Sequence, residues 1–292
     1  MKILISKLPP SGWWNSGVPK YEDNPAMREG KRPNYDKLVT ERERLISILK
    51  NEHQTIIEID FPKSLDKDDP KHDFIFVRDQ FISNQNGLVL ILRSGEPLRR
   101  VENLVMKNIL NEFNYDIVQM PDVSGLRADG GEFYFCEKES ILFSGIQRNT
   151  RSGIDYVVEI LNIKELLILD GKGYHLDTFF TPVLNNESIL CALIVCDEIL
   201  TNKSKADLYE FSKRRKVPIF KVPLKDSIGT SKSIGSFSVN ALPLPGVLIS
   251  PNKFTNKSID RKLLELGVKR VITPTSQFEL SGGSIHCLTN EL

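Results

Sequence analysis

The chain has 292 residues, 40% of them hydrophobic, and its 39 basic and 38 acidic residues leave a formal net charge of +1. A chain of this length and composition can bury a sizeable core as one large domain or two small ones. Charges of both signs are mixed along the sequence, so neither a nucleic-acid-binding surface nor an anionic-membrane surface is predicted.

The N-terminus predicts no targeting segment. Its apolar start turns polar and reaches Pro9 and Pro10 too soon for a signal peptide, and no later run approaches the length of a membrane span. The four cysteines give neither the density of a disulfide scaffold nor a C-x-x-C pair for zinc. We therefore expect a cytoplasmic protein with reduced thiols, no metal and no cofactor.

Five times along the chain, a segment with helical spacing of apolar residues is followed by a short apolar strand. The strand segments are rich in β-branched residues and are nearly continuous runs of apolar residues, which is typical of buried strands. The units recur at roughly fifty to sixty residues, near the period of propellers and arrays. One repeat cannot bury its own apolar face, so we expect five to close around a common axis as a single α/β domain, residues 1–292. The helix and strand pairs are 36–50 with 56–59, 97–113 with 117–120, 154–162 with 166–169, 204–214 with 217–222, and 258–266 with 268–273, and further strands are expected at 87–92, 141–143, 189–196 and 247–249.

The loops of this repeat hold the residues that can do chemistry. Cys287 follows Gly282 and Gly283, which lack Cβ atoms and allow a ligand to approach a thiol at a strand end. A closed repeat would gather loops from different units at one end of its axis, which predicts one site. The other candidates are Asp79, Asp129, His175 and Asp177.

Six ordered motifs carry a resemblance to a known family. They are FVRD at 76–79, GEPLRR at 95–100, DGGEF at 129–133, IQRNTRSG at 146–153, HLD at 175–177 and GGSIHCLT at 282–289. Over nearly the whole chain they resemble the guanidino-group modifying enzymes, which include arginine deiminases, agmatine deiminases, amidinotransferases and dimethylarginine dimethylaminohydrolases. The resemblance implies their fold, the five-bladed α/β propeller called the pentein.

The resemblance also implies a role for each candidate. Cys287 would be the nucleophile, His175 the general acid and base, and Asp129 the carboxylate that orients His175. Asp79 and Asp177 would hold the guanidinium of the substrate.

Four more residues are candidates for substrate binding. Arg99 and Arg148 fall where arginine deiminases and dimethylarginine hydrolases place arginines that bind the substrate's α-carboxylate, through bidentate pairing. Asp73 and Phe76 precede Asp79 in the same run. The ending His286-Cys287-x-Thr289 instead resembles agmatine deiminases and amidinotransferases, so arginine and its close derivatives are expected substrates and the subfamily stays open.

The chemistry of a guanidinium explains these residue types. The group is planar and positively charged, so two carboxylates can accept its N–H groups in the plane while a nucleophile approaches the carbon from above. The bound cation also favours the thiolate of Cys287, whose ordinary pKa of about 8.5 leaves it mostly protonated at neutral pH. His175 can then protonate the departing amine and later take a proton from the attacking water.

Other polar or aromatic residues are expected to serve the structure. His53 and His72 lie in polar segments and are predicted to be on the surface, whereas His286, on the opposite face of a strand from Cys287, is expected in packing or in a supporting bond. The remaining cysteines are predicted in the core. Trp13 and Trp14 are expected to cover the site or a partner surface, or to pack as an ordinary N-terminal loop. The Ser- and Gly-rich segment 227–238 is expected to be a flexible loop near the site.

The sequence therefore predicts a hydrolase that cleaves a C–N bond of arginine or a close guanidino derivative through a covalent thiol intermediate. An amidinotransferase would use the same intermediate with an amine in place of water. A binding module on the same fold is the alternative that is not an enzyme. The predicted partner is a small guanidino compound, with no nucleic acid and no membrane, and the oligomeric state stays open.

Overall fold

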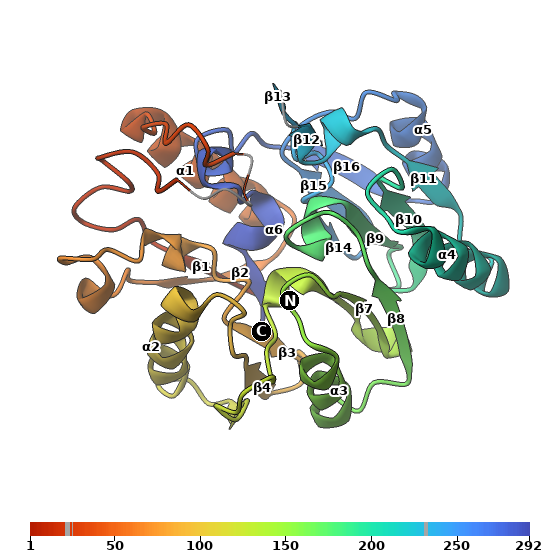
Figure 1. Cartoon of the computed structure of the whole chain (residues 1–292). Helices are drawn as coiled ribbons and strands as arrows, with labels where there is room; N and C mark the ends of the chain where they lie inside the picture. Colours follow the sequence, from red (N-terminus) through yellow and green to blue (C-terminus); the bar gives the residue numbers. More distant parts are fainter. Residues whose placement is uncertain (21–23, 25, 231–232) are drawn as a thin grey trace.

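The computed structural model describes residues 1–20, 24, 26–230 and 233–292. Within these ranges five three-stranded sheets share one topology, in which the central strand pairs antiparallel with one neighbour and parallel with the other. A helix connects each parallel pair, as such a crossover requires. Figure 1 shows the five helices around the outside of the molecule.

The bounds follow the sequence prediction closely. The helices are α1 (Tyr35–Asn51), α2 (Arg100–Leu110), α3 (Arg151–Ile160), α4 (Asn202–Arg215) and α5 (Ser258–Glu265). The central strands are β1 (Lys2–Ser6), β4 (Leu88–Ile91), β7 (Ile141–Gly145), β10 (Leu190–Val195) and β15 (Val247–Ser250). Their parallel partners are β2 (Thr55–Ile59), β5 (Asp116–Gln119), β8 (Glu165–Leu169), β11 (Ile219–Lys221) and β16 (Lys269–Ile272).

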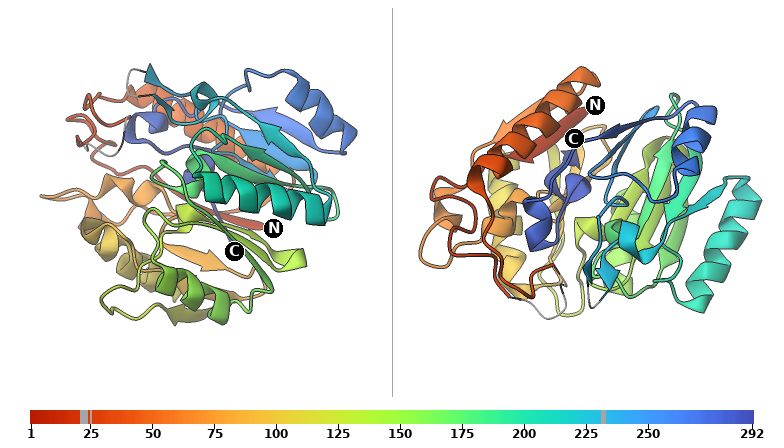
Figure 2. Two further views of the ribbon diagram at one scale, coloured as in Figure 1. Left: turned by 45° about the vertical axis from the view of Figure 1, so that its right-hand side comes forward. Right: turned by 90° about the horizontal axis from the view of Figure 1, so that it is seen from above.

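The antiparallel partners form the inner side of the molecule. They are β3 (Phe81–Ser83), β6 (Phe133–Cys136), β9 (Phe180–Leu184), β14 (Leu242–Leu244) and β17 (Asn290–Glu291). Inner strands of different sheets contact one another, since β17 packs on β3 and β9 packs on both β6 and β14. Because β17 pairs with β1, the two ends of the chain lie side by side, as both views of Figure 2 show.

The helices begin where the sequence places a capping residue. The Asn34 side chain accepts a hydrogen bond from the backbone N–H of Lys37 at the start of α1, and Thr201 accepts one from Ser204 at the start of α4. The expected helix 97–113 is split, because Pro97 opens a 3₁₀ turn (Pro97–Arg99) before α2 begins. The apolar face of α1, with Leu38, is fully buried against the sheets.

Two further features bear on the predictions. The Ser- and Gly-rich segment forms a short hairpin of β12 (Gly229–Thr230) and β13 (Ser233–Ile234), and its residues 231 and 232 lie outside the described residues. Among the helices described, none combines the length and the apolar character needed to cross a bilayer.

Candidate active site

Each of the five sheets sends one polar side chain to the centre of the molecule. In every case the residue lies two to four positions before the inner strand: Asp79 before β3, Asp129 before β6, Asp177 before β9, Asn240 before β14 and Cys287 before β17. The predicted site residues therefore do come together, because the repeat places equivalent loops at one end of the sheets. Asn240 was missed from the sequence.

A cavity of about 280 Å³ opens at this end of the molecule. Among the predicted residues, Asp73, Phe76, Asp79, Arg99, Arg148, His175 and Cys287 line it. Asp129 and Asp177 lie behind this surface and are 1% and 0% exposed. The same wall also includes residues that the sequence did not single out for it, namely Asn24, Met27, Glu102 and Tyr174.

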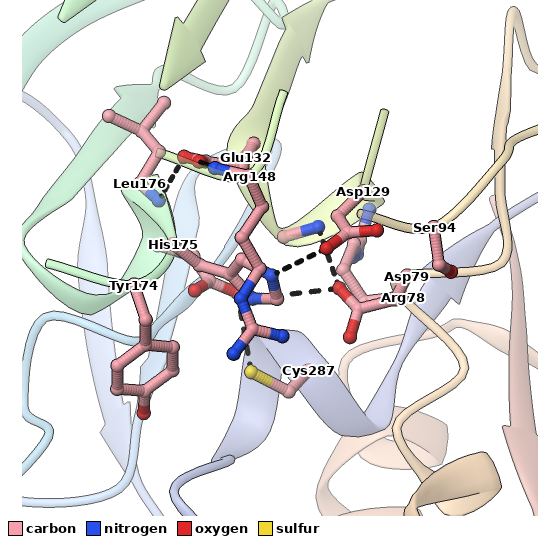
Figure 3. A network of polar contacts seen from close by, with 12 residues as sticks. Arg78, Asp79, Ser94, Asp129, Glu132, Arg148, Tyr174, His175, Leu176 and Cys287 are labelled. Atoms are coloured by element: carbon pink, nitrogen blue, oxygen red, sulfur yellow. Dashed lines mark hydrogen bonds and ion pairs between the residues drawn. The ribbon is translucent and has the colours of Figure 1, made fainter. Parts of the chain in front are cut away.

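His175 lies between two carboxylates, as Figure 3 shows. Its Nε2 is 3.2 Å from Oδ2 of Asp129, and its Nδ1 is 3.6 Å from Oδ1 of Asp79. Burial lowers the pKa of His175, but the charges of Asp79 and the bond to Asp129 outweigh it and raise that pKa to about 9. At neutral pH the imidazole is therefore protonated and ready to donate a proton.

Cys287 lies in α6 (Ile285–Leu288), a single helical turn near the centre of Figure 1. The prediction of a strand end at Cys287 is thus wrong. Gly282 has a φ of +79°, and the chain after it turns back toward the inner side and forms the helical turn. A Cβ on Gly283 would collide with the ring of Phe76, so glycine is needed for this close packing. The glycines serve the course of the backbone next to the thiol.

The sulfur of Cys287 has two polar neighbours. Its thiol donates to Oδ2 of Asp177 over 3.3 Å, and it accepts from Nδ2 of Asn240 over 3.3 Å. Burial, together with the charges of Asp177 and Asp79, raises the pKa of Cys287 well above its ordinary value. In the site without a substrate the sulfur is therefore a thiol.

Asp177 has one carboxylate oxygen in contacts and one without a partner. Its Oδ2 accepts from His286 Nδ1 over 2.8 Å as well as from Cys287, while Oδ1 is buried without a hydrogen-bond partner in the described structure. Buried carboxylate oxygens are normally paired. His286 is 1% exposed and stacks near Tyr134, with ring centres 4.1 Å apart, so its supporting bond agrees with the prediction although the residue lies on a helical turn.

Arg99 holds Asp79 and faces a second carboxylate. Its guanidinium pairs with Oδ2 of Asp79, and it donates to Glu102 from Nε over 3.0 Å and from Nη2 over 2.7 Å. Burial raises the pKa of Asp79, but the charges of His175 and Arg99 outweigh it and lower that pKa to about 2. Arg99 therefore keeps Asp79 ionised beside the cavity.

Arg148 lies on another side of the cavity. Figure 3 shows its guanidinium directed toward His175 and Cys287. Its backbone N–H donates to Oε1 of Glu132 over 2.7 Å, and Oε2 of Glu132 accepts from the backbone N–H of Leu176 over 2.9 Å. Glu132, the last residue of DGGE, thus ties the loop of Arg148 to the loop of His175. No sequence pattern predicts this role.

Asp73 and Phe76 line the cavity in different ways. Oδ1 of Asp73 accepts from Ser281 over 2.7 Å, and burial raises the pKa of Asp73. Phe76 packs edge-on against Trp13, with ring centres 6.1 Å apart. Asp73 therefore connects the loop before β3 to the segment that leads to Cys287. Phe76 forms an apolar part of the cavity wall.

The N-terminal loop corrects the prediction for His72. This residue is 4% exposed, its Nε2 is 2.8 Å from Asp66, and its Nδ1 accepts from the backbone N–H of Trp14 over 3.0 Å. The loop that carries Trp13 and Trp14 covers it, which its polar neighbours in sequence do not reveal. Trp14 also lines the cavity, whereas Trp13 is buried.

The remaining predictions for the core are mixed. Cys136 and Cys196 are buried, and Cys191 is half-buried. All four cysteines are free thiols. Among the residues that the structure describes, no three His, Cys, Asp or Glu side chains are arranged to hold a metal ion.

Comparison with solved structures identifies the fold. The N-terminal domain of ArgZ, an arginine dihydrolase from the ornithine-ammonia cycle in cyanobacteria, aligns with 99% of the chain and 96% of its own length, at 22% identity and a TM-score of 0.79. DDAH from Pseudomonas aeruginosa aligns with 100% of the chain and 98% of its own length, at 16% identity and a TM-score of 0.72. Both are guanidino-modifying enzymes with the pentein fold. The chain has the pentein fold.

The chain matches only part of the full-length relatives. The chain covers only 40% of full-length ArgZ. It covers 39% of AgrE, which was solved as a ternary complex with ornithine and NAD⁺, at 21% identity and a TM-score of 0.79. ArgZ was solved covalently bound to a reaction intermediate and, as a cysteine-to-serine mutant, bound to its substrate, and a cysteine-to-serine mutant of DDAH was solved with citrulline. No family model and no curated protein sequence matches the chain.

Proposed function

We propose that the chain is a hydrolase that cleaves a C–N bond of arginine or a close guanidino derivative through a covalent intermediate on Cys287. The observation that carries the proposal is that a thiol, a protonated imidazole and the carboxylate of Asp79 line one cavity, with Asp129 directly behind His175 and Asp177 directly behind Cys287. The pentein fold, which ArgZ and DDAH share, supports it.

Two carboxylates would hold the substrate cation. Asp79 is ionised, with its pKa near 2, and Asp177 has the unpartnered oxygen Oδ1. Both can accept N–H groups of a guanidinium in its plane as charge-assisted hydrogen bonds. The positive charge would also offset the acidic groups that keep Cys287 protonated, so substrate binding favours the thiolate.

The reaction then runs in two halves. As the cation binds, the thiol of Cys287 releases its proton to solvent. The resulting thiolate forms an S–C bond to the central carbon while the electrons of the C=N bond move to nitrogen. His175 gives its proton to the departing amine, the C–N bond breaks, and a thiouronium remains on Cys287. Neutral His175 next takes a proton from water as the oxygen adds to the carbon. The hydroxyl of the adduct then gives its proton to solvent and becomes the ureido carbonyl while the C–S bond breaks and its electron pair returns to sulfur, so that a ureido product leaves.

Asp129 would orient the imidazole through both halves. It accepts from the Gly95 backbone over 2.9 Å with Oδ1 and faces His175 with Oδ2, so it is fixed on both sides. Such a third group holds the tautomer that a general acid and base needs. The same residues would serve an amidinotransferase, and the product alone distinguishes water from an amine as acceptor.

We also propose how the fold closes, which compartment suits the protein and which partner it binds. We infer that the five sheets close as one five-bladed propeller with approximate fivefold symmetry over residues 1–292, supported by the contacts between inner strands and by the pairing of β17 with β1. A reducing compartment such as the cytoplasm suits a nucleophile that must stay a free thiol. The expected partner is the small guanidino substrate.

Replacing the nucleophile tests the proposal. Cys287→Ser should lower turnover by about a thousandfold or more and leave substrate binding largely intact, since a hydroxyl is a far weaker nucleophile of similar shape. The assay measures ammonia, methylamine and ureido products from arginine, methylated arginines and agmatine, with mass spectrometry for a covalent adduct. Cys191→Ser, at a half-buried thiol in β10, is the control and should keep native rates. Native rates in Cys287→Ser would exclude the mechanism.

A further inference from the structure

Asn240 is fully buried and contacts the sulfur of Cys287. Its Nδ2 lies 3.3 Å from that sulfur and 3.2 Å from the backbone carbonyl of Asp177. Its Oδ1 accepts from the backbone N–H of His286 over 3.0 Å and from that of Cys287 over 3.5 Å. One amide thus connects the nucleophile, its helical turn and the loop of Asp177.

These contacts fix the direction in which the amide faces. A backbone N–H can only donate, so the atom opposite His286 must be the oxygen of Asn240. A backbone carbonyl can only accept, so the atom opposite Asp177 must be the nitrogen. Nδ2 has two hydrogens: one serves the carbonyl and the other is left for the sulfur.

We propose that Asn240 is a catalytic residue that donates a hydrogen bond to the sulfur of Cys287 and stabilises its thiolate. The proposal rests on the proposed function in that it takes Cys287 as the nucleophile. A fixed donor aimed at an atom where negative charge develops stabilises that charge without reorganising during the reaction.

The surroundings of the sulfur show why such a donor matters. Oδ2 of Asp177 is 3.3 Å away, and burial and the nearby carboxylates hold the pKa of Cys287 high. The hydrogen bond from Asn240 acts against them. A substrate cation also favours the thiolate, but only while its charge is bound. Asn240 remains beside the sulfur when the C–S bond breaks and the electron pair returns to it.

Alkylation with iodoacetamide measures how far Cys287 is ionised, and it needs no catalytic turnover. The reagent forms an S–C bond with the thiolate and releases iodide, so the rate follows the ionised fraction of the thiol. Asn240→Asp keeps an acceptor for the backbone and removes the donor, and Asn240→Ala removes both. In each, the pH midpoint for labelling Cys287 should rise by about one unit or more, with at least about a tenfold lower rate at pH 8.

Matched variants separate this effect from a general loss of structure. Asn103 is also a buried asparagine, 3% exposed, and it contacts Ser94 and the carbonyl of Gln80. Asn103→Asp should therefore leave the labelling midpoint of Cys287 within about 0.3 unit of the wild type. Cys287→Ser shows by mass spectrometry which label belongs to this thiol.

A measurement on the wild-type protein covers the case in which the variants fail to fold. The side-chain amide signal of Asn240 in ¹⁵N–¹H spectra should move downfield as Cys287 ionises, because a thiolate is the stronger acceptor. An unchanged midpoint in a folded Asn240 variant, or a signal that stays in place, would overturn the proposal. Full turnover in Cys287→Ser would refute the nucleophile, while the alkylation midpoint would still report on the bond between Asn240 and sulfur.

Discussion

The two arginines that the sequence pairs as carboxylate-binding residues have different surroundings. Arg99 donates to Glu102 and Asp79, and its Nη2 also donates to the backbone carbonyl of Asp73 over 3.2 Å. The guanidinium of Arg99 is already paired with two carboxylates. These contacts indicate that Arg99 positions Asp79 rather than binding a substrate carboxylate. Arg148 lines the cavity from another side, and Figure 3 shows its guanidinium directed toward His175 and Cys287. We predict that Arg148 is the residue that binds the substrate carboxylate.

This difference predicts that the effect of one alanine variant depends on the substrate and that the effect of the other does not. Arg148→Ala should remove about 1.5–3 kcal/mol of charged hydrogen bonding, which weakens arginine by about ten- to a hundredfold and changes agmatine little. Arg99→Ala should lower kcat/KM for both compounds alike, because Asp79 grips the guanidinium that they share. Steady-state kinetics on the two substrates measures both effects.

Arg151 supplies the control for this pair. It lies in the same motif as Arg148, its side chain is 65% exposed, and it pairs with Asp155 on the surface of α3. Arg151→Ala should keep native kinetics for both substrates. A loss in Arg99→Ala that is confined to arginine would instead return Arg99 to the carboxylate end of the substrate.

At the scale of helices and loops, the sequence predicts regular elements better than the course of the chain between them. The five helices and their strands follow from apolar periodicity and lie within a few residues of the expected bounds. The turn of Cys287 does not, because a stretch as short as Ser-Ile-His-Cys after two glycines fits a strand or a helix equally well. The polar neighbours of His72 in sequence predict a surface residue, because nothing local shows that Trp14 covers it.

Asn240 shows what a repeat can reveal that a motif cannot. It follows Phe237 and Val239, in a loop with no catalytic signature, and nothing in its immediate sequence suggests chemistry. Its place two residues before β14 is equivalent to those of the four other central residues. Aligning the repeats by their inner strands would have found it, provided that those short strands could be located from the sequence.

The loop before β6 gives a prediction at this scale. A Cβ on Gly131 would lie 2.5 Å from Nδ1 of His175 and 2.9 Å from Oδ1 of Asp79, so two site residues would have to move. A misplacement of about 1 Å can cost about a hundredfold in rate. Gly131→Ala should therefore lower kcat by about a hundredfold in a protein that still folds, as circular dichroism and steady-state kinetics can show.

A change in a helix cap is the control for Gly131→Ala. Thr201 caps α4 on the outside of the molecule, and Thr201→Ala should cost about 1 kcal/mol of stability. It should leave kcat unchanged because this cap bond lies at the start of α4 and Thr201 is not among the residues that line the cavity. Equal losses of activity in the two variants would mean that stability, and not the position of His175, limits the rate.

At the scale of the whole molecule, the last residues of the chain bind the segment before β3 and so hold Cys287 against the first half of the fold. The Asn290 side chain donates to the carbonyls of Val77, Arg78 and Phe81 over 2.9–3.3 Å. Glu291 pairs with Nη1 of Arg78 over 2.5 Å. These bonds lie within four residues of Cys287 and join positions more than 200 residues apart, so global folding and assembly of the site depend on each other.

Glu291→Gln should expose this dependence through pH. Burial alone would raise the pKa of Glu291, but Arg78 outweighs it and lowers that pKa below its ordinary value. The ion pair therefore stabilises the fold fully above the unfolded pKa, and this contribution is lost as the pH falls through the lower folded value. At pH 7 the variant should lose about 3 kcal/mol of unfolding free energy, because the charge of Arg78 stays buried without its partner.

Urea denaturation from pH 7 to pH 3 measures the difference between Glu291→Gln and the wild type. The difference should be constant above about pH 5 and shrink below it. Glu265→Gln is the control, since its pair with Arg261 is 66% and 75% exposed and should contribute less than about 1 kcal/mol at any pH. A difference that does not change with pH would show that Glu291 acts by packing alone, and the coupling between the chain end and the site would then rest on Asn290.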